Sequence, residues 1–82
     1  MWRNEEMKLE LYKKDTCPFC RKVFMAIEEM GRTDIEMHDI IDSAEDRERL
    51  IRDGGKLQVP CLFIDGKPMY ESDDIVAWLR EN

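Results

Sequence analysis

The sequence has few cysteines and no long apolar run. Its three cysteines cannot all pair within one molecule, which argues against a secreted scaffold held together by disulfides. No stretch approaches the about 18 apolar residues of a membrane-spanning helix. The segment MWRNEEMKLELY carries acidic residues and no apolar run of signal-peptide length. We therefore expect a cytoplasmic protein without a membrane partner.

Basic residues are also scarce relative to acidic ones. Thirteen Lys and Arg stand against nineteen Asp and Glu, and the net charge is −6. This argues against a nucleic-acid partner, because binding of the phosphate backbone requires a basic face. The 82 residues, 43% apolar and 39% charged, suffice for one small globular domain. We expect a single, monomeric domain over residues 1–82, of which residues 1–7 form a short polar lead.

Hydrophobic periodicity in the first half of the chain predicts a strand, a helix and a second strand. KLELYK alternates Leu9 and Leu11 with polar residues, which is typical of a half-buried strand. CPFCRKVFMAIEEMG places apolar residues at helical spacing, with Pro18 in the first turn and Gly31 at the end. DIEMHDI is the second strand candidate. Such a unit has parallel strands and a right-handed connection.

The second half of the chain predicts a helix, a hairpin and a final helix. DSAEDRERLIRDGG opens with Ser43 as its cap, and Glu45 and Arg49 are spaced for an ion pair on a solvated face over residues 42–53. Asp65-Gly66, between PCLFI and KPMY, is a two-residue hairpin signal. Ser72 caps DDIVAWLREN. The order βαβαββα predicts an α/β fold, a four-stranded mixed sheet with helices on both faces.

The segment DTCPFCRK places Cys17 at the start of a helix and Cys20 one turn inside it. The thiolate is the reactive form of cysteine, and a free thiol has a pKa of about 8.5. Helix-start N–H groups and the helix dipole favour negative charge at Cys17. The flanking charges are the cations Lys14, Arg21 and Lys22, opposed by Asp15. We therefore expect Cys17 to be a low-pKa nucleophile, and Cys20 to resolve the mixed disulfide that it forms.

Two other interpretations of the cysteine pair stay open at this point. A structural zinc site needs four ligands, whereas CxxC supplies two, and the spacing of His38 and Cys61 does not indicate a cluster. Inert core thiols favour apolar surroundings, whereas Cys17 lies at a strand-to-helix turn. Cys61 is either a small buried side chain or an additional reactive thiol. His38 is expected at the surface or in packing contacts, and the methionines and Trp78 in the core.

Several motifs, with the element order, resemble the glutaredoxins, thioredoxin-fold enzymes that use glutathione. The motifs are YKKDTCPFC, the Val59-Pro60 pair within QVPCLFIDGKPMYESDDI, and the helix start Ser72-Asp73-Asp74. They keep the family's order and spacing over residues 8–81. CPFCRKVFMAIEEMG and YESDDI are also similar to the N-terminal domain of glutathione transferases, which hold the γ-glutamyl group with a Glu-Ser pair, here Glu71-Ser72.

The resemblance implies a role for each matched position. Cys17 is the nucleophile and Cys20 the resolving thiol. Pro60 follows a cis peptide bond, and Val59 pairs through its backbone with the cysteinyl part of glutathione. The rest of the implied glutathione groove is Lys14 and Gln58 at the glycine-end carboxylate, Phe19 along the groove, and Ser72 and Asp73 at the γ-glutamyl end. Gln58 and Glu71 depart from the family's usual threonine and glycine.

These roles imply a glutathione-dependent thiol–disulfide oxidoreductase that reduces protein disulfides and glutathione mixed disulfides. It would use glutathione as co-substrate, with no metal and no tightly bound cofactor, and its partners would be disulfide-bearing or glutathionylated proteins. One alternative is the same dithiol chemistry with a thioredoxin reductase as the electron donor. A second is a module that holds an iron–sulfur cluster with glutathione, against which Cys20 and Pro18 argue. A third is an adaptor domain that keeps the groove without turnover.

Overall fold

The structure, a computed structural model, describes residues 7–82. Residues 1–6 hold most of the predicted polar lead, which therefore lies outside the described residues. The elements follow the predicted order and are β1 (Leu9–Lys13), α1 (Pro18–Met30), β2 (Ile35–Asp39), α2 (Ala44–Gly54), β3 (Cys61–Ile64), β4 (Lys67–Met69) and α3 (Ser72–Glu81). Within residues 7–82, no helix is long and apolar enough to cross a membrane.

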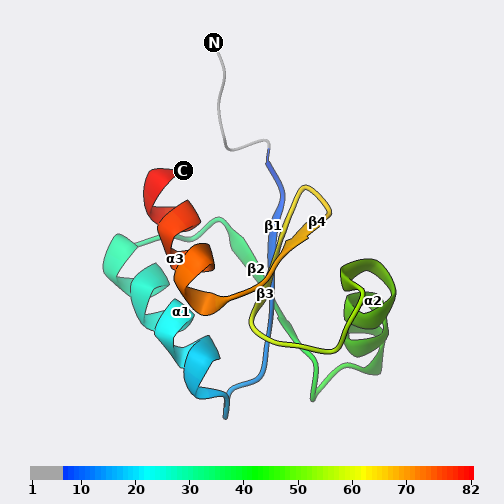
Figure 1. The fold of residues 1–82 in the computed structure, drawn as a ribbon. Helices are drawn as coiled ribbons and strands as arrows, with labels where there is room; N and C mark the ends of the chain where they lie inside the picture. Colours follow the sequence, from blue (N-terminus) through cyan, green and yellow to red (C-terminus); the bar gives the residue numbers. More distant parts are fainter. Residues whose placement is uncertain (1–6) are drawn as a thin grey trace.

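The strands form one four-stranded mixed sheet in the order β2-β1-β3-β4. β1 and β2 are parallel, with Leu9 opposite Ile35, and β3 runs antiparallel to both β1 and β4. α1 and α3 pack together on one face of the sheet, and α2 lies on the other (Figure 1). The predicted α/β fold, with helices on both faces of a mixed sheet, is therefore confirmed.

Side-chain alternation along β1 and β3 divides the interior into two cores. Leu11 faces α1 and α3, whereas Tyr12 faces α2, because successive residues of a strand point to opposite faces of its sheet. The core under α1 and α3 contains Leu9, Leu11, Val23, Ile27, Leu62, Ile75 and Leu79, and the core under α2 contains Tyr12, Ile40, Leu50, Cys61 and Phe63. Tyr12 is opposite Cys61 in the sheet, so the end of β1 lies beside the start of β3.

Local sequence signals end the helices and turn the hairpin as predicted. Cys17 is the extended N-cap of α1, and Gly31 ends the helix with a φ of 69°. In α2 the Ser43 hydroxyl accepts a hydrogen bond of 3.2 Å from the Asp46 N–H. The Asp65-Gly66 turn has φ values of 51° and 87°, the positive values that a two-residue hairpin requires. These boundaries follow from residues within one turn of each other.

The start of α3 differs from the prediction. Ser72 is the first helical residue, so the N-cap is Glu71 and the expected cap at Ser72 is wrong by one residue. Glu71 has a φ of 74°, in the left-handed region that favours glycine, and its side chain makes no capping hydrogen bond. Because this positive φ already directs the chain into α3, Ser72 takes helical geometry and becomes buried.

Arg49 points into the protein rather than along a solvated helix face. Its Nη1 lies 3.0 Å from both carboxylate oxygens of Glu10 and 2.8 Å from Tyr12 Oη. Glu10 is only 4% exposed, and a buried carboxylate without a partner would be strongly destabilising. The predicted Glu45–Arg49 pair is therefore wrong, since Arg49 instead pairs with Glu10 and with Asp53. The face over residues 42–53 is only partly solvated.

Replacing Glu71 by glycine should stabilise the protein. A left-handed backbone costs a non-glycine residue about 1–2 kcal/mol, and the greater freedom of glycine in the unfolded chain offsets about 0.5 kcal/mol of that gain. We expect Glu71→Gly to raise the free energy of unfolding by about 1 kcal/mol, measured by urea denaturation. Ala77→Gly, at an exposed helical position of α3, is the control and should lose about 1 kcal/mol. A lower free energy of unfolding for Glu71→Gly would contradict strain at this residue.

Candidate functional site

Cys17 and Cys20 lie where β1 leads into the first turn of α1. The Cys17 N–H donates to the Lys14 carbonyl at 3.1 Å, and the Arg21 N–H donates to the Cys17 carbonyl at 3.0 Å, so hydrogen bonds fix both sides of the turn. Cys17 is half-buried, whereas Cys20, one turn further along, is fully buried. Both are free thiols. The predicted nucleophile and resolving thiol are therefore neighbours at one helix start.

The surroundings of Cys17 favour its thiolate. Partial burial alone would raise the pKa of Cys17, but several groups outweigh it and lower the pKa below the ordinary value. These groups are the backbone N–H groups of Cys20 and Phe19, the Cys20 thiol, and the positive charge of Lys14. The helix start therefore lowers the pKa of Cys17, in the direction expected from the sequence.

The other two cysteines are held in the thiol form. Burial raises the pKa of Cys20 to about 12 and the pKa of Cys61 to about 11. Cys61 is 0% exposed and belongs to the core under α2. This supports the small buried side chain over the additional reactive thiol. Among the three cysteines, Cys17 alone combines solvent access with a lowered pKa, which makes it the candidate nucleophile of the site.

A groove of about 320 Å³ extends from the start of α1 to the start of α3. Its lining residues are Phe19, Lys22, Gln58, Val59, Pro60, Glu71, Ser72 and Asp73. The Val59–Pro60 peptide bond is cis, as the resemblance implied, and Cys17 Sγ lies 3.9 Å from the Val59 carbonyl oxygen. The structure thus gathers the predicted glutathione positions beside the nucleophile, except for Lys14, whose charge instead acts on Cys17.

Lys22 also lines this groove, a position that its place in the sequence did not predict. The Lys22 ammonium forms an ion pair of 2.5 Å with the Asp73 carboxylate, which links α1 to α3 across the groove. Both side chains are more than half exposed, so the pair adds little stability. The sequence feature that could have indicated this contact is that Lys22 lies one helical turn before the buried Ala26, on the side of α1 that is near α3. Helical spacing does not fix the direction of a flexible lysine side chain, which the structure turns toward Asp73.

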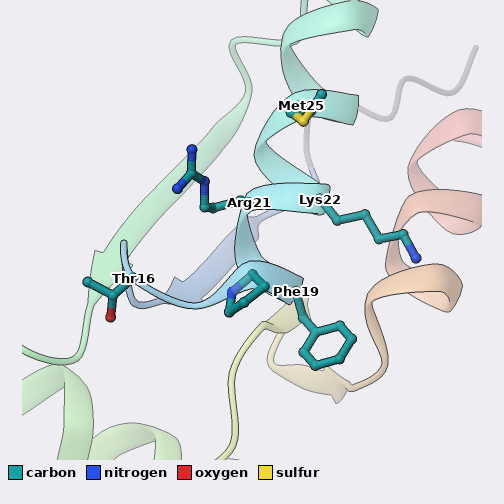
Figure 2. A pocket seen from close by; sticks show the side chains of 6 residues that line it. Thr16, Phe19, Arg21, Lys22 and Met25 are labelled. Carbon is teal, nitrogen blue, oxygen red and sulfur yellow. The ribbon is translucent and has the colours of Figure 1, made fainter.

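A second hollow, of about 550 Å³, lies on the outer side of α1 (Figure 2). We call it the α1 hollow, and its lining residues are Thr16, Pro18, Phe19, Arg21, Lys22 and Met25. Figure 2 shows Arg21 and Lys22 extending to opposite sides of α1, with Met25 further along the helix. Phe19 lines both the groove and the α1 hollow. The α1 hollow adjoins Cys17 because Thr16 and Pro18 flank Cys17 in the chain, and the groove adjoins it through Val59, whose carbonyl oxygen is 3.9 Å from Cys17 Sγ.

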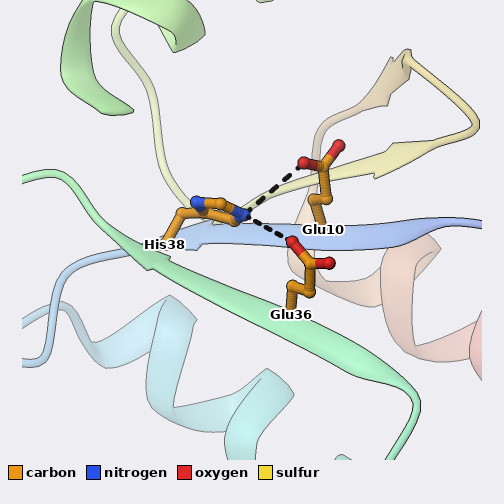
Figure 3. A group of neighbouring side chains, drawn as sticks. All are labelled: Glu10, Glu36 and His38. Carbon is orange, nitrogen blue, oxygen red and sulfur yellow. Dashed lines mark hydrogen bonds and ion pairs between the residues drawn. The ribbon is translucent and has the colours of Figure 1, made fainter. Parts of the chain in front are cut away.

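A polar cluster on the α2 face holds three potential metal ligands (Figure 3). The ligand atoms of Glu10, Glu36 and His38 lie within 4.8 Å of one another, and His38 Nε2 is 3.2 Å from Glu36 Oε1. Arg49 already binds both oxygens of Glu10 and would repel a cation, while the His38 ring stacks on Tyr12 at a centroid distance of 4.7 Å. We therefore interpret His38 as a packing residue. The cysteines join no such ligand group among the described residues, which argues against the zinc alternative.

The thiol environments predict that Cys17 alone reacts quickly near neutral pH. A thiolate exists above its pKa, so the lowered pKa of Cys17 extends its alkylation to lower pH while Cys20 and Cys61 stay protonated. We expect iodoacetamide to label Cys17 first, located by mass spectrometry, with a midpoint of rate against pH below about 8.5. Lys14→Met should raise that midpoint, whereas Lys67→Met on β4 should not. Equal labelling of Cys61 would contradict this assignment.

Comparisons with known proteins relate these features to a family. Residues 11–82 match the family model described as glutathione S-transferase, N-terminal domain. Glutaredoxin 3 of Escherichia coli (strain K12) is 33% identical over 69 residues, which cover 84% of this chain and 82% of that protein. A thioredoxin-like protein of known structure is 25% identical, with a TM-score of 0.76 over 92% of this chain and all of its own.

A glutathione transferase shares the fold over a smaller part of its length. Glutathione transferase E6 from Drosophila melanogaster is 28% identical, with a TM-score of 0.71, over 90% of this chain and 34% of the transferase. The glutaredoxin relatives support a glutaredoxin-like redox function and thiol–disulfide oxidoreductase activity. The chain therefore belongs to the glutaredoxin family, with a fold that it shares with the N-terminal domain of glutathione transferases.

Proposed function

We propose that the chain reduces protein disulfides and glutathione mixed disulfides with electrons from glutathione. The observation that carries this proposal is the position of Cys17, a half-buried thiol of lowered pKa beside the groove between α1 and α3. Cys20, protonated and one turn deeper, supplies the second thiol. Relatives named glutaredoxin and glutathione transferase share the fold, which favours glutathione as the co-substrate.

The dithiol route begins with the Cys17 thiolate. It attacks one sulfur of a substrate disulfide, forms a Cys17–substrate disulfide, and releases the other substrate sulfur as a thiolate that takes a proton from water. Cys20 then attacks Cys17 Sγ, and its proton passes to the substrate sulfur that leaves. The products are a reduced substrate and a Cys17–Cys20 disulfide. The second attack is intramolecular and local, since Cys20 lies one helical turn from Cys17.

Two glutathione molecules restore the dithiol. The first attacks Cys17 Sγ, forms a glutathione–Cys17 disulfide and frees Cys20, and the second attacks the glutathione sulfur and releases Cys17 with oxidised glutathione. Two electrons thus pass from two glutathione molecules to one disulfide. A glutathionylated substrate needs only Cys17, which takes the glutathione directly and releases the substrate thiol.

The groove offers a partner for each polar part of glutathione. The Val59 backbone would pair with the cysteinyl segment, because its carbonyl oxygen is 3.9 Å from Cys17 Sγ, and Gln58 would meet the glycine-end carboxylate. At the far end, the N–H groups that begin α3 at Ser72 would hold the γ-glutamyl carboxylate. The Asp73 carboxylate would exchange Lys22 for the glutathione amine. This arrangement directs the glutathione sulfur toward Cys17.

A thioredoxin reductase as electron donor is the second candidate, and two features of the groove favour it. Glu71 adds a carboxylate where the γ-glutamyl carboxylate would lie, and Asp73 is already paired with Lys22. Repulsion between like charges and competition for Asp73 would both weaken glutathione binding. The thiol chemistry at Cys17 is the same with either donor.

Turnover of a glutathione mixed disulfide tests the thiol roles and the donor. The substrate is the disulfide of glutathione and 2-hydroxyethanethiol, with glutathione and glutathione reductase as the coupled donor. We expect wild-type turnover, a loss of about 100-fold or more in Cys17→Ser, and retained turnover in Cys20→Ser, because Cys17 is the attacking nucleophile. Cys61→Ala is the control, since its thiol is buried in the core under α2.

Each contrary result has a distinct meaning. Turnover with thioredoxin reductase but not with glutathione would show that thioredoxin reductase is the electron donor, and would leave the proposed roles of the thiols unchanged. Turnover in Cys17→Ser would overturn the proposed nucleophile. Dependence on Cys20 for this small mixed disulfide would exclude the route that uses Cys17 alone.

Removing the charge of Asp73 should weaken glutathione recognition. We expect Asp73→Asn to raise the KM for the glutathione mixed disulfide about fivefold, equivalent to about 1 kcal/mol for an exposed charge pair, with little change in kcat. Asp74→Asn is the matched control, because Asp74 also lies in the first turn of α3 but does not line the groove. Equal effects of the two substitutions would indicate loss of helix-start charge rather than loss of a glutathione contact.

A further inference from the structure

The α1 hollow shares Phe19 and Lys22 with the glutathione groove, but Thr16, Pro18, Arg21 and Met25 do not line that groove. The lining residues of the hollow run from Thr16 and Pro18, on either side of Cys17, along α1 to Met25. We propose that the α1 hollow docks disulfide-bearing substrate proteins through a segment that carries an apolar and an acidic side chain next to the reacting cysteine. This inference rests on the proposed thiol–disulfide function and names the substrate class of the same site.

The apolar part of the α1 hollow consists of side chains that the fold leaves exposed. Phe19 and Met25 are 62% and 63% exposed, although both are large apolar residues on a helix whose opposite face enters the core. Exposed apolar side chains that line one hollow are typical of a binding surface rather than of a solvated helix face. The flexible methionine side chain can adapt to apolar partners of different shape. A partner's apolar side chain would therefore bury against Phe19 and Met25.

The charged part of the α1 hollow differs in sign from the rest of the chain. The net charge is −6, yet the ionic groups that line the hollow are Arg21 and Lys22. Lys22 pairs with Asp73, whereas Arg21 forms no ion pair with any residue of the described part of the chain. Figure 2 shows the Arg21 side chain extending away from Lys22. An acidic partner would complement Arg21 here and be repelled by the acidic surface elsewhere.

The position of the α1 hollow favours a substrate over a second copy of the chain. Phe19 and Lys22 line both the α1 hollow and the groove, so a protein segment in the hollow and glutathione in the groove would approach Cys17 from neighbouring sites. A bound segment would lie directly beside Cys17, where its disulfide must be attacked. A second copy bound in the α1 hollow would instead obstruct access to Cys17.

Matched peptides separate docking from chemistry. One short disulfide-cyclised peptide carries Leu and Glu beside a cysteine, and a second carries Ser and Lys at the same positions. The disulfide of glutathione and 2-hydroxyethanethiol is too small to bind in the α1 hollow in this way, so its turnover measures the thiol chemistry alone. We expect kcat/KM to be about fivefold higher for the Leu/Glu peptide, and Arg21→Glu to remove that preference. Met25→Gln should lower kcat/KM for the Leu/Glu peptide about threefold. The small mixed disulfide should react unchanged in Met25→Gln. In Arg21→Glu its rate measures any effect of the lost cation on Cys17, and the preference is taken as the ratio of the two peptide rates within each variant, which cancels that effect.

Two substitutions outside the α1 hollow serve as controls. Arg47→Glu makes the same change of charge on an exposed residue of α2, and Met37→Gln makes the same change of side chain on an exposed residue of β2. Equal effects of Arg21→Glu and Arg47→Glu would assign the preference to net charge and overturn the docking proposal.

Other outcomes also decide the question. Unchanged peptide kinetics in Arg21→Glu and Met25→Gln, with normal turnover of the small mixed disulfide, would overturn docking and leave the proposed function intact. No wild-type turnover of any substrate would refute the proposed function itself. If sedimentation velocity showed a dimer that Met25→Gln converts to a monomer, with no change in peptide kinetics, the occupant would be a second copy and the proposal would be wrong.

Discussion

The central strand β1 is the constraint on which both cores and the site depend. It pairs in parallel with β2 and antiparallel with β3, and it sends Leu11 into one core and Tyr12 into the other. Its carboxyl end leads into the turn that carries Cys17, and its pairing with β3 brings Val59 to the same edge of the sheet. A register shift of one residue would exchange the side chains of the two cores and break this alignment.

Burial, more than position in the chain, distinguishes the three thiols. Cys17 and Cys20 are one helical turn apart, yet their pKa values shift in opposite directions. Helix-start N–H groups stabilise the first sulfur as a thiolate, whereas the core surrounds the second. Cys61 lies in the other core and is also kept protonated by burial. One helix start can therefore favour the thiolate at one sulfur while the next sulfur, one turn further along, stays protonated.

The two faces of the sheet use their charged residues differently. Under α2, Arg49 is enclosed with Glu10 and Tyr12, so its charge neutralises a buried carboxylate. On the other face, Lys22 links α1 to α3, and Arg21 extends into solvent beside exposed apolar side chains. The first arrangement stabilises the fold, because a buried carboxylate needs its partner. The second leaves charge and apolar area available near Cys17, which is the condition for binding other molecules.

Features that depend on neighbouring residues could be predicted from the sequence alone. The alternation in KLELYK, the cap at Ser43, the stop at Gly31 and the Asp65-Gly66 turn specified the elements and their order, and the CPFC segment specified a thiol at a helix start. The motifs that resemble glutaredoxins named most of the residues that the structure gathers in the groove.

Contacts between residues that are distant in the chain depend on the tertiary packing. It turned Arg49 inward to Glu10, directed Lys22 to Asp73, gave Glu71 a positive φ, and buried Cys61 completely. Local patterns act over about one helical turn or one strand pair. The direction of a long charged side chain, and the burial of a small one, depend instead on which elements pack beside it, and that is fixed only when the sheet and its helices are assembled.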